Sequence, residues 1–167
     1  MTTDEESFRR WAAERQLALL RTATLLTGDR QRAEDLVQEA LTKVALRWRR
    51  LRDDNPEAYA RQIIVRDNIS AWRKRRREVV VDRLPRVAVP DHTVASERRL
   101  LLDEALAALT PRQRAVVVLR YYDDLTERAA AEALGVSVGT VKSQTHLALS
   151  RLREAAPELA ELLGEES

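Results

Sequence analysis

Polar side chains cluster in the stretch after Gly135, where the sequence reads GVSVGTVKSQTH. Their hydroxyl, amide, ammonium and imidazole groups donate and accept the hydrogen bonds that base edges and phosphates require. The stretch lies between a short and a long helical pattern, and two helices joined by a tight glycine-containing turn form a helix-turn-helix motif. Such a motif places the start of its second helix in the major groove of DNA. The candidate DNA-contacting residues are Ser137, Thr140, Lys142, Ser143, Gln144 and His146.

The basic residues are nearly all arginines, because only Lys43, Lys74 and Lys142 are lysines. Arginines gather in RWRRLR at 47–52 and WRKRRR at 72–77. The planar guanidinium group binds phosphates and guanine edges with two parallel hydrogen bonds, which indicates nucleic-acid contact. A GC-rich genome would enrich arginine as well, and a helical hairpin with a merely solvated outer face would show the same spacing.

Residue types that support catalysis or metal binding are sparse. The chain has no cysteine, and its two histidines, His92 and His146, are far apart, so neither a thiolate nor a two-histidine metal site is expected. The carboxylate pairs Asp53-Asp54 and Asp123-Asp124 fall at helix ends, where capping explains them. No glycine-rich phosphate loop or nucleophile elbow is present. We therefore expect no enzymatic activity, no metal and no cofactor.

The elements that must carry these residues are helical. The low aromatic share of 4% and only 4 glycines favour an all-α fold over a sheet. Apolar residues recur at helical spacing, and Ser96, Thr110, Thr126 and Ser137 stand where helix caps are expected. The predicted helices are 5–26, 30–50, 56–77, 96–109, 111–122, 126–134 and 138–155. Ala130, Ala131, Leu134, Val136, Val141, Ala148 and Leu152 are predicted to face inward.

The chain divides into two small helical domains joined by a flexible linker. Residues 1–80 form the first domain, residues 81–95 the linker and residues 96–160 the second domain. The linker contains Pro85 and Pro90 and lacks a helical period. The N-terminus has no signal-peptide pattern, and no apolar run approaches the ~20 residues of a membrane span. We expect a cytoplasmic protein with no membrane insertion.

Longer motifs resemble one known family. The segment LTPRQRAVVVLRYYDDLTERAAAEALGVSVGTVKSQ is similar to region 4 of sigma-70-family RNA polymerase sigma factors, and GDRQRAEDLVQEALTKVALRWRR followed by NPEAYARQIIVRDNISAWRKRRR is similar to region 2. The combination of both regions with a short linker resembles the extracytoplasmic-function (ECF, group IV) sigma factors. The arginine bias and the region 4 motif are similar to those of actinobacterial members. The first domain is then a three-helix region 2 domain and the second a region 4 helix-turn-helix domain.

The resemblance implies a transcription initiation factor that binds core RNA polymerase and directs promoter recognition and melting of the −10 element. The implied partners are the β′ clamp helices and β flap of bacterial core RNA polymerase, promoter DNA and, as for many members of the family, an anti-sigma factor. The loop Arg52–Asn55 matches the family loop that captures a flipped base of the −10 element.

The resemblance also assigns residues to three surfaces. The motif that docks on polymerase corresponds to Asp35, Leu36, Val37, Gln38 and Glu39. The −10 DNA-binding residues are Asn55, Tyr59, Arg61, Arg66, Asn68, Trp72, Arg73 and Arg76. The −35 DNA-binding residues are Arg114, Ser137, Thr140, Lys142, Ser143, Gln144, His146 and Arg151.

The chain departs from the family pattern at three of the positions compared. Arg66 stands where the family usually has Asn, Ser70 stands where it often has Asp or a similar residue, and Leu147 stands where relatives commonly carry Arg. An exposed Leu147 can instead contact a thymine methyl group or a protein.

Two other classes of protein remain as alternatives. A LuxR-type or response-regulator-like transcriptional regulator has similar C-terminal helices, binds palindromic DNA as a dimer and needs no polymerase for binding. Such regulators normally carry a sensing domain upstream, and residues 1–80 lack the strand–helix alternation of one. A pure protein adaptor would not need the basic cluster at 72–77.

Overall fold

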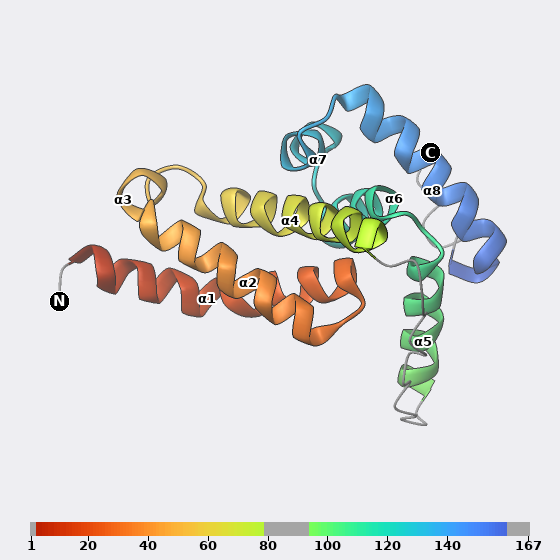
Figure 1. Ribbon diagram of the computed structural model, residues 1–167, viewed down its shortest axis with the longest axis horizontal. Coiled ribbons are helices and arrows are strands. Elements are labelled where there is room, and N and C mark those ends of the chain that lie inside the picture. Colours follow the sequence, from red (N-terminus) through yellow and green to blue (C-terminus); the bar gives the residue numbers. More distant parts are fainter. Residues whose placement is uncertain (1–2, 79–93, 160–167) are drawn as a thin grey trace.

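The computed structural model describes residues 3–78 and 94–159, and every regular element in these ranges is helical (Figure 1). The N-terminal half consists of the first four helices and the C-terminal half of the others. In chain order they are α1 (Thr3–Thr27), α2 (Arg30–Leu46), α3 (Trp48–Leu51), α4 (Pro56–Glu78), α5 (Val94–Ala107), α6 (Pro111–Val117), η1 (Val118–Tyr122), α7 (Glu127–Leu134) and α8 (Val138–Ala155). The prediction of an all-α chain with two helical parts is confirmed.

Local capping sets the boundaries of the N-terminal half. Gly28 adopts φ 68° after α1, and the Asp29 carboxylate accepts hydrogen bonds from the backbone N–H groups of Gln31 and Arg32 at the start of α2. The predicted helix 30–50 is interrupted at Arg47, and α3 forms a separate turn. This break accompanies the burial of Trp48, whose ring lies 5.4 Å from that of Phe8.

The caps predicted for the C-terminal half are confirmed with one exception. Thr110 forms a capping box with Gln113, and Thr126 and Ser137 accept hydrogen bonds from the first turns of α7 and α8. The exception is Ser96, which was expected to cap a helix, because α5 already begins at Val94. No glycine or proline follows Val94 within α5, so nothing stops the helix from starting there.

The helix that begins at Pro111 changes character halfway. From Val118 to Tyr122 it becomes η1, a π-helical turn in which the backbone N–H of Asp123 donates to the carbonyl of Val118. Such a turn holds one more residue than an α-helical turn and marks functional positions in many helices. Here the turn places Asp123 at the boundary between the two halves.

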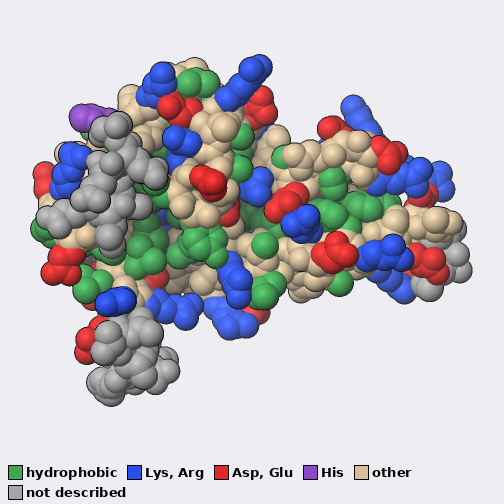
Figure 2. Space-filling model, turned by 180° about the vertical axis from the view of Figure 1, so that it is seen from behind, with side chains coloured by type: hydrophobic (Ala, Val, Ile, Leu, Met, Phe, Trp, Pro, Cys, Tyr) green, Lys and Arg blue, Asp and Glu red, His purple; other side chains and the backbone are tan. Residues whose placement is uncertain are grey.

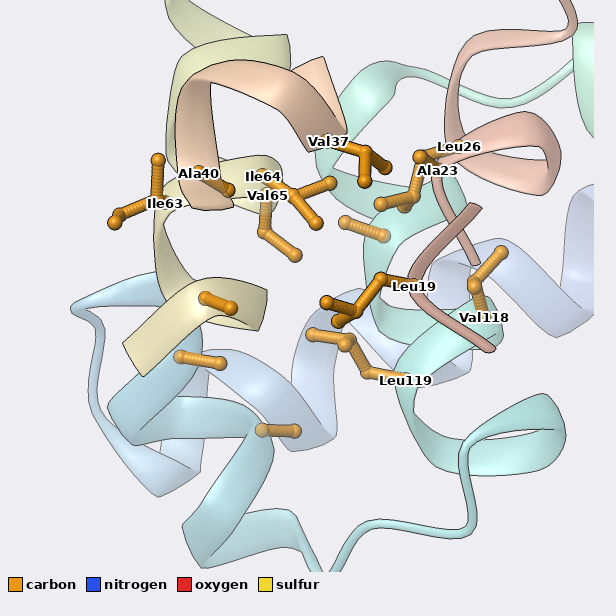
Figure 3. Close-up of a cluster of buried hydrophobic side chains, with 14 of the residues drawn as sticks. Leu19, Ala23, Leu26, Val37, Ala40, Ile63, Ile64, Val65, Val118 and Leu119 are labelled. Atoms are coloured by element: carbon orange, nitrogen blue, oxygen red, sulfur yellow. The ribbon is translucent and has the colours of Figure 1, made fainter. Parts of the chain in front are cut away.

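The two halves share one hydrophobic core. Leu19, Leu26 and Ile64 of the N-terminal half pack in one cluster with Val118 and Leu119 of the C-terminal half (Figure 3). Helix α4 lies against α7 and also contacts α6. A second, smaller cluster joins α5, α6 and α8 through residues that include Leu106, Val117, Ala148 and Leu152. The sequence predicted the two parts but not this contact between them.

The inward positions of the helix-turn-helix are mostly as predicted. Five of the expected residues are buried, and Leu134 and Val136 are half-buried; the buried ones are Ala130, Ala131, Val141, Ala148 and Leu152. Ala133, which was not predicted, is also buried because its side of α7 joins the shared core.

The predicted linker at 81–95 lies outside the described residues except for Val94 and Ala95, which belong to α5. Among the described helices, none combines the length and apolar character that a bilayer crossing requires.

Candidate nucleic-acid interface

The start of α8 presents a capped, polar face. The Ser137 hydroxyl accepts a hydrogen bond from the Thr140 backbone N–H at 3.1 Å, and the two hydroxyls lie 2.9 Å apart. Ser143 donates to the Thr140 carbonyl at 3.0 Å. Lys142, Ser143 and His146 are exposed, and Thr140 and Gln144 are half-buried. The helix start is therefore ordered by its own side chains and open to a ligand.

Lys142 is oriented by the preceding helix. Its ammonium group lies 4.0 Å from a carboxylate oxygen of Glu127 on α7, a weak exposed ion pair that a phosphate can replace. His146 is the only histidine among the described residues.

The next turn of α8 faces the basic end of α4. Gln144 and Leu147 line a groove of about 300 Å³ together with Trp72, Arg73 and Arg76 of α4. Leu147 is 48% exposed, although it is apolar. The Arg76 guanidinium lies 5.2 Å from the centre of the Trp72 ring, a cation–π contact that orients both side chains. Candidate −10 and −35 residues thus line one groove in this arrangement.

Two candidate −35 arginines contact backbone carbonyls of the protein. Arg114 is only 6% exposed, and its Nε donates to the Leu25 carbonyl of α1 at 2.5 Å. Arg151 donates to the Ala108 carbonyl at 3.4 Å and remains exposed. Arg114 therefore cannot reach DNA while the two halves stay packed, whereas Arg151 can.

The candidate base-capture loop lies at the other end of α4. Asn55 is exposed, and its side-chain oxygen accepts a hydrogen bond from the Ala58 backbone N–H at 3.0 Å. Tyr59, one turn further along α4, accepts a hydrogen bond from the Arg47 guanidinium at 2.5 Å, and the same group lies 5.5 Å from the centre of its ring. These contacts fix the start of α4 and the orientation of Tyr59.

Three candidate −10 residues are occupied by contacts inside the protein. Arg66 donates to the carbonyls of Ala133 at 3.1 Å and Glu132 at 3.0 Å, which lie at the C-terminal end of α7. Cations favour that end of a helix because its carbonyls carry partial negative charge. Asn68 is 4% exposed and donates to the Leu26 carbonyl at 3.4 Å, so it serves the core.

The third occupied residue, Arg61, pairs with a buried carboxylate of the C-terminal half. Its Nε lies 3.5 Å from one oxygen of Asp123, and the other oxygen accepts a hydrogen bond from the Thr22 hydroxyl at 2.8 Å. Burial raises the pKa of Asp123, while the Thr22 hydrogen bond and the Arg61 charge act against that rise. Sequence reasoning assigned Asp123 only a capping role, because its partners are far away in the chain, Thr22 by 101 positions.

The candidate polymerase-docking motif is exposed on one side of α2. Asp35, Gln38 and Glu39 are exposed and Leu36 is half-buried, whereas Val37 is 1% exposed and belongs to the core. The hydrogen bonds that the Lys43 ammonium donates to Glu39 first, and then to Asp67, raise the pKa of Lys43, and the contact with Asp67 holds this side of α2 against α4. Val37 therefore supports the motif from inside and offers no surface to a partner.

A metal site finds no support in the described residues, which contain no group of three histidine, cysteine, aspartate or glutamate side chains placed to hold an ion. In the view of Figure 2, basic side chains gather with some acidic ones at the end formed by the start of α1 and α3.

Comparison with known proteins assigns the two halves separately. The model for Sigma-70 region 2 matches residues 6–78, and the model for Sigma-70 region 4 matches residues 99–152. An RNA polymerase sigma-E factor of Streptomyces avermitilis is 42% identical over 149 residues, which cover 88% of this chain and 83% of that protein. The ECF RNA polymerase sigma factor SigL of Mycobacterium tuberculosis is 36% identical over 156 residues, covering 87% of this chain and 86% of that protein.

Solved structures show the same fold. The sigma factor RpoE in complex with the anti-sigma factor NepR from Bartonella quintana superposes with a TM-score of 0.68 at 25% identity, covering 90% of this chain and 97% of that chain. CnrH in complex with the cytosolic domain of CnrY superposes with a TM-score of 0.63 at 20% identity, covering 98% and 91%.

Proposed function

This chain belongs to the extracytoplasmic-function group of sigma-70-family RNA polymerase sigma factors, and we propose that it assigns the steps of promoter recognition to separate helices. Helix α2 docks on the β′ clamp helices of core polymerase through Asp35, Gln38 and Glu39. The loop Arg52–Asn55 and the exposed residues of α4 capture and hold the melted −10 strand. Helix α8 reads the −35 element, with the C-terminal half bound to the β flap.

One observation carries this proposal: the two matched family regions coincide with the two structural halves. Region 2 spans α1–α4 and region 4 spans nearly all of α5–α8. A LuxR-type regulator would have only the second of these parts. The comparisons therefore support the sigma role over that alternative.

The chain acts by binding and catalyses no reaction itself. Extruding a base from duplex DNA costs a few kcal/mol, which the loop and the aromatic residues of α4 offset by hydrogen bonds and stacking. Arginine–phosphate contacts add affinity that falls with salt. The chain works in the bacterial cytoplasm, where polymerase and promoter meet.

Promoter binding requires the two halves to separate. Arg66, Arg61 and Arg114 make contacts across the boundary between them, so these residues become available to DNA only in an open arrangement. Binding of core polymerase would supply the energy for opening. An anti-sigma protein, such as NepR in the RpoE complex, would act by holding the halves in a form that polymerase cannot use.

Transcription in vitro with purified actinobacterial core polymerase and a genomic promoter library tests the proposal. Transcripts from a defined set of promoters should appear only when this protein is added. Asp35→Ala should weaken its binding to core polymerase roughly tenfold, about 1.4 kcal/mol, because it removes an exposed charge of the docking face. Glu34→Gln is the matched control, since Glu34 pairs with Arg30 on its own helix. Binding to palindromic DNA as a dimer without polymerase would overturn the proposal.

A further inference from the structure

We propose that Asp4 is a positioning residue for promoter melting, because it holds the loop Arg52–Asn55 in the conformation that captures an unpaired base. This inference rests on the proposed function of that loop. It assigns a role to the first turn of α1, which precedes the segment matched to Sigma-70 region 2, since that match begins at residue 6.

Both carboxylate oxygens of Asp4 are used, each by a different arginine. The Nε of Arg49, on α3, donates to one oxygen at 2.8 Å. The guanidinium of Arg52, the first residue of the loop, donates to the other oxygen. One carboxylate therefore joins α1, α3 and the loop. Hydrogen bonds between ionised partners are shorter and stronger than neutral ones, so this group restrains all three segments.

A second connection fixes the same turn of α1 against α3. The Ser7 hydroxyl donates to the backbone carbonyl of Asp4 at 3.0 Å and accepts a hydrogen bond from the Trp48 indole N–H at 2.7 Å. The Trp48 ring packs edge-on against Phe8 and lies 5.5 Å from the ring of Trp11. Asp4 thus stands on a rigid base rather than at a fraying terminus.

The loop is then held at both ends and open in the middle. Arg52 is tied to Asp4 at its start, and Asn55 caps α4 through the Ala58 N–H at its end. Asp53 and Asp54 between them are exposed, and the Asp54 backbone N–H donates to the Leu51 carbonyl at 3.0 Å. A site that recognises one extruded base needs this kind of preformed backbone, because small displacements weaken oriented hydrogen bonds.

A simpler explanation of Asp4 is insufficient. Acidic residues favour the positive end of any helix, and α1 begins with Asp4, Glu5 and Glu6. Glu5, however, pairs with Arg9 on its own helix, whereas Asp4 reaches residues 45 and 48 positions away. The network also lies at the end of the molecule opposite the C-terminal half, so it does not depend on how the halves are arranged (Figure 1).

Holoenzyme assembled with core polymerase provides the test. A promoter found in the transcription experiment supplies single-stranded −10 oligonucleotides that differ at one base, and their affinities give the base preference at each position. Asp4→Asn should reduce the preference at the captured position by roughly threefold to tenfold, because the loop samples several conformations. Asp4→Glu, which keeps the carboxylate, should restore part of it. Glu6→Gln, which removes a first-turn charge from the exposed side, should leave it unchanged.

The outcomes separate the positioning role from a structural one. Core-polymerase affinity and binding of duplex −35 DNA should be the same for all variants, and thermal unfolding reports any loss of stability. If Asp4→Asn keeps the wild-type base preference, or lowers all affinities equally, the positioning role is wrong while the proposed function stands. If the wild-type holoenzyme shows no base preference in the −10 strand, the proposed function of the loop fails and the inference fails with it.

Discussion

The outer face of α8 and the inner face of α4 carry similar polar residues but differ in what covers them. On α8, Lys142, Ser143 and His146 are exposed, and the cap is satisfied within the helix. On α4, Arg66 and Asn68 are engaged by the C-terminal half and by the core. Polar residues are thus open to a ligand on α8 and are used by the fold on α4. The candidate −35 residues at the start of α8 are accessible in this arrangement, whereas Arg114 and the candidate −10 residues Arg61 and Arg66 become accessible only after the halves part.

The largest effect on stability should come from a substitution in the core that the two halves share. Leu119 is fully buried in the shared cluster, so Leu119→Ala should lower the free energy of unfolding by about 2–5 kcal/mol. Leu147→Ala, at the exposed face of α8, should change it by less than ~0.5 kcal/mol. Chemical denaturation measures both. Equal losses for the two variants would show that the covered and open faces do not differ as described.

Gly135 lies between α7 and α8 and next to Arg66 of α4. Its φ of 68° strains any other residue, and an added Cβ would lie 3.0 Å from the Arg66 guanidinium. Gly135→Ala should therefore cost about 1–2 kcal/mol of unfolding free energy.

Gly139→Ala is the control for Gly135→Ala. Its Cβ would meet only the Ser137 hydroxyl, at 3.8 Å, and a helix gains up to about 1 kcal/mol from this change. Thermal denaturation should move the two variants in opposite directions. A Gly135→Ala protein as stable as the wild type would contradict the close contact between α7 and Arg66.

Arg66 itself should control how often the two halves separate. Arg66→Gln removes the cation from the carbonyls of Ala133 and Glu132 and should favour the open arrangement by about 1 kcal/mol, a roughly fivefold shift. The chain has no cysteine, so dyes attached at Ala13→Cys and Ser150→Cys report the distance between halves by energy transfer. Lys74→Gln removes an equal charge from the exposed side of α4. A matching response from both variants would assign the effect to net charge.

The smallest effect should be a pH dependence of the equilibrium between the packed and open arrangements of the halves. Burial raises the pKa of Asp123 in the packed arrangement, and opening returns it toward its ordinary value. The packed form therefore binds the proton more tightly, so acidification through the raised pKa favours packing, and raising the pH through it favours opening. Burial is the main cause of this shift in pKa; Thr22 and Arg61 reduce it, and Glu57 adds to it. Energy transfer should vary with pH in the wild type and much less in Asp123→Asn.

Local features of the fold were predictable because they depend on neighbours in sequence. The caps at Asp29, Thr110, Thr126 and Ser137 and the left-handed Gly135 each need only a few adjacent residues. The early start of α5 and the break at Arg47 were missed, because helical periodicity locates the centre of a helix better than its ends.

Contacts across the chain were not predictable. Nothing near Arg66 in sequence indicates that its partners are backbone carbonyls of α7, although its departure from the family pattern was visible. A motif match assigns positions without regard to their exposure, so Val37 was assigned to the docking motif although it is buried. Its helical spacing from Ala33 and Leu41 was the signal that favoured the core, where the structure places it.

The π-helical turn η1 makes the fit between the halves depend on the length of the chain at one point. Each residue of a regular helix turns the chain by about 100°. Deleting a single residue between Val118 and Tyr122 would turn η1 into an ordinary α-helical turn and rotate Asp123 away from Thr22. The composition of both halves would hardly change, yet the surfaces by which the halves pack would no longer be aligned. Insertions and deletions at this point should therefore be far less tolerated than substitutions.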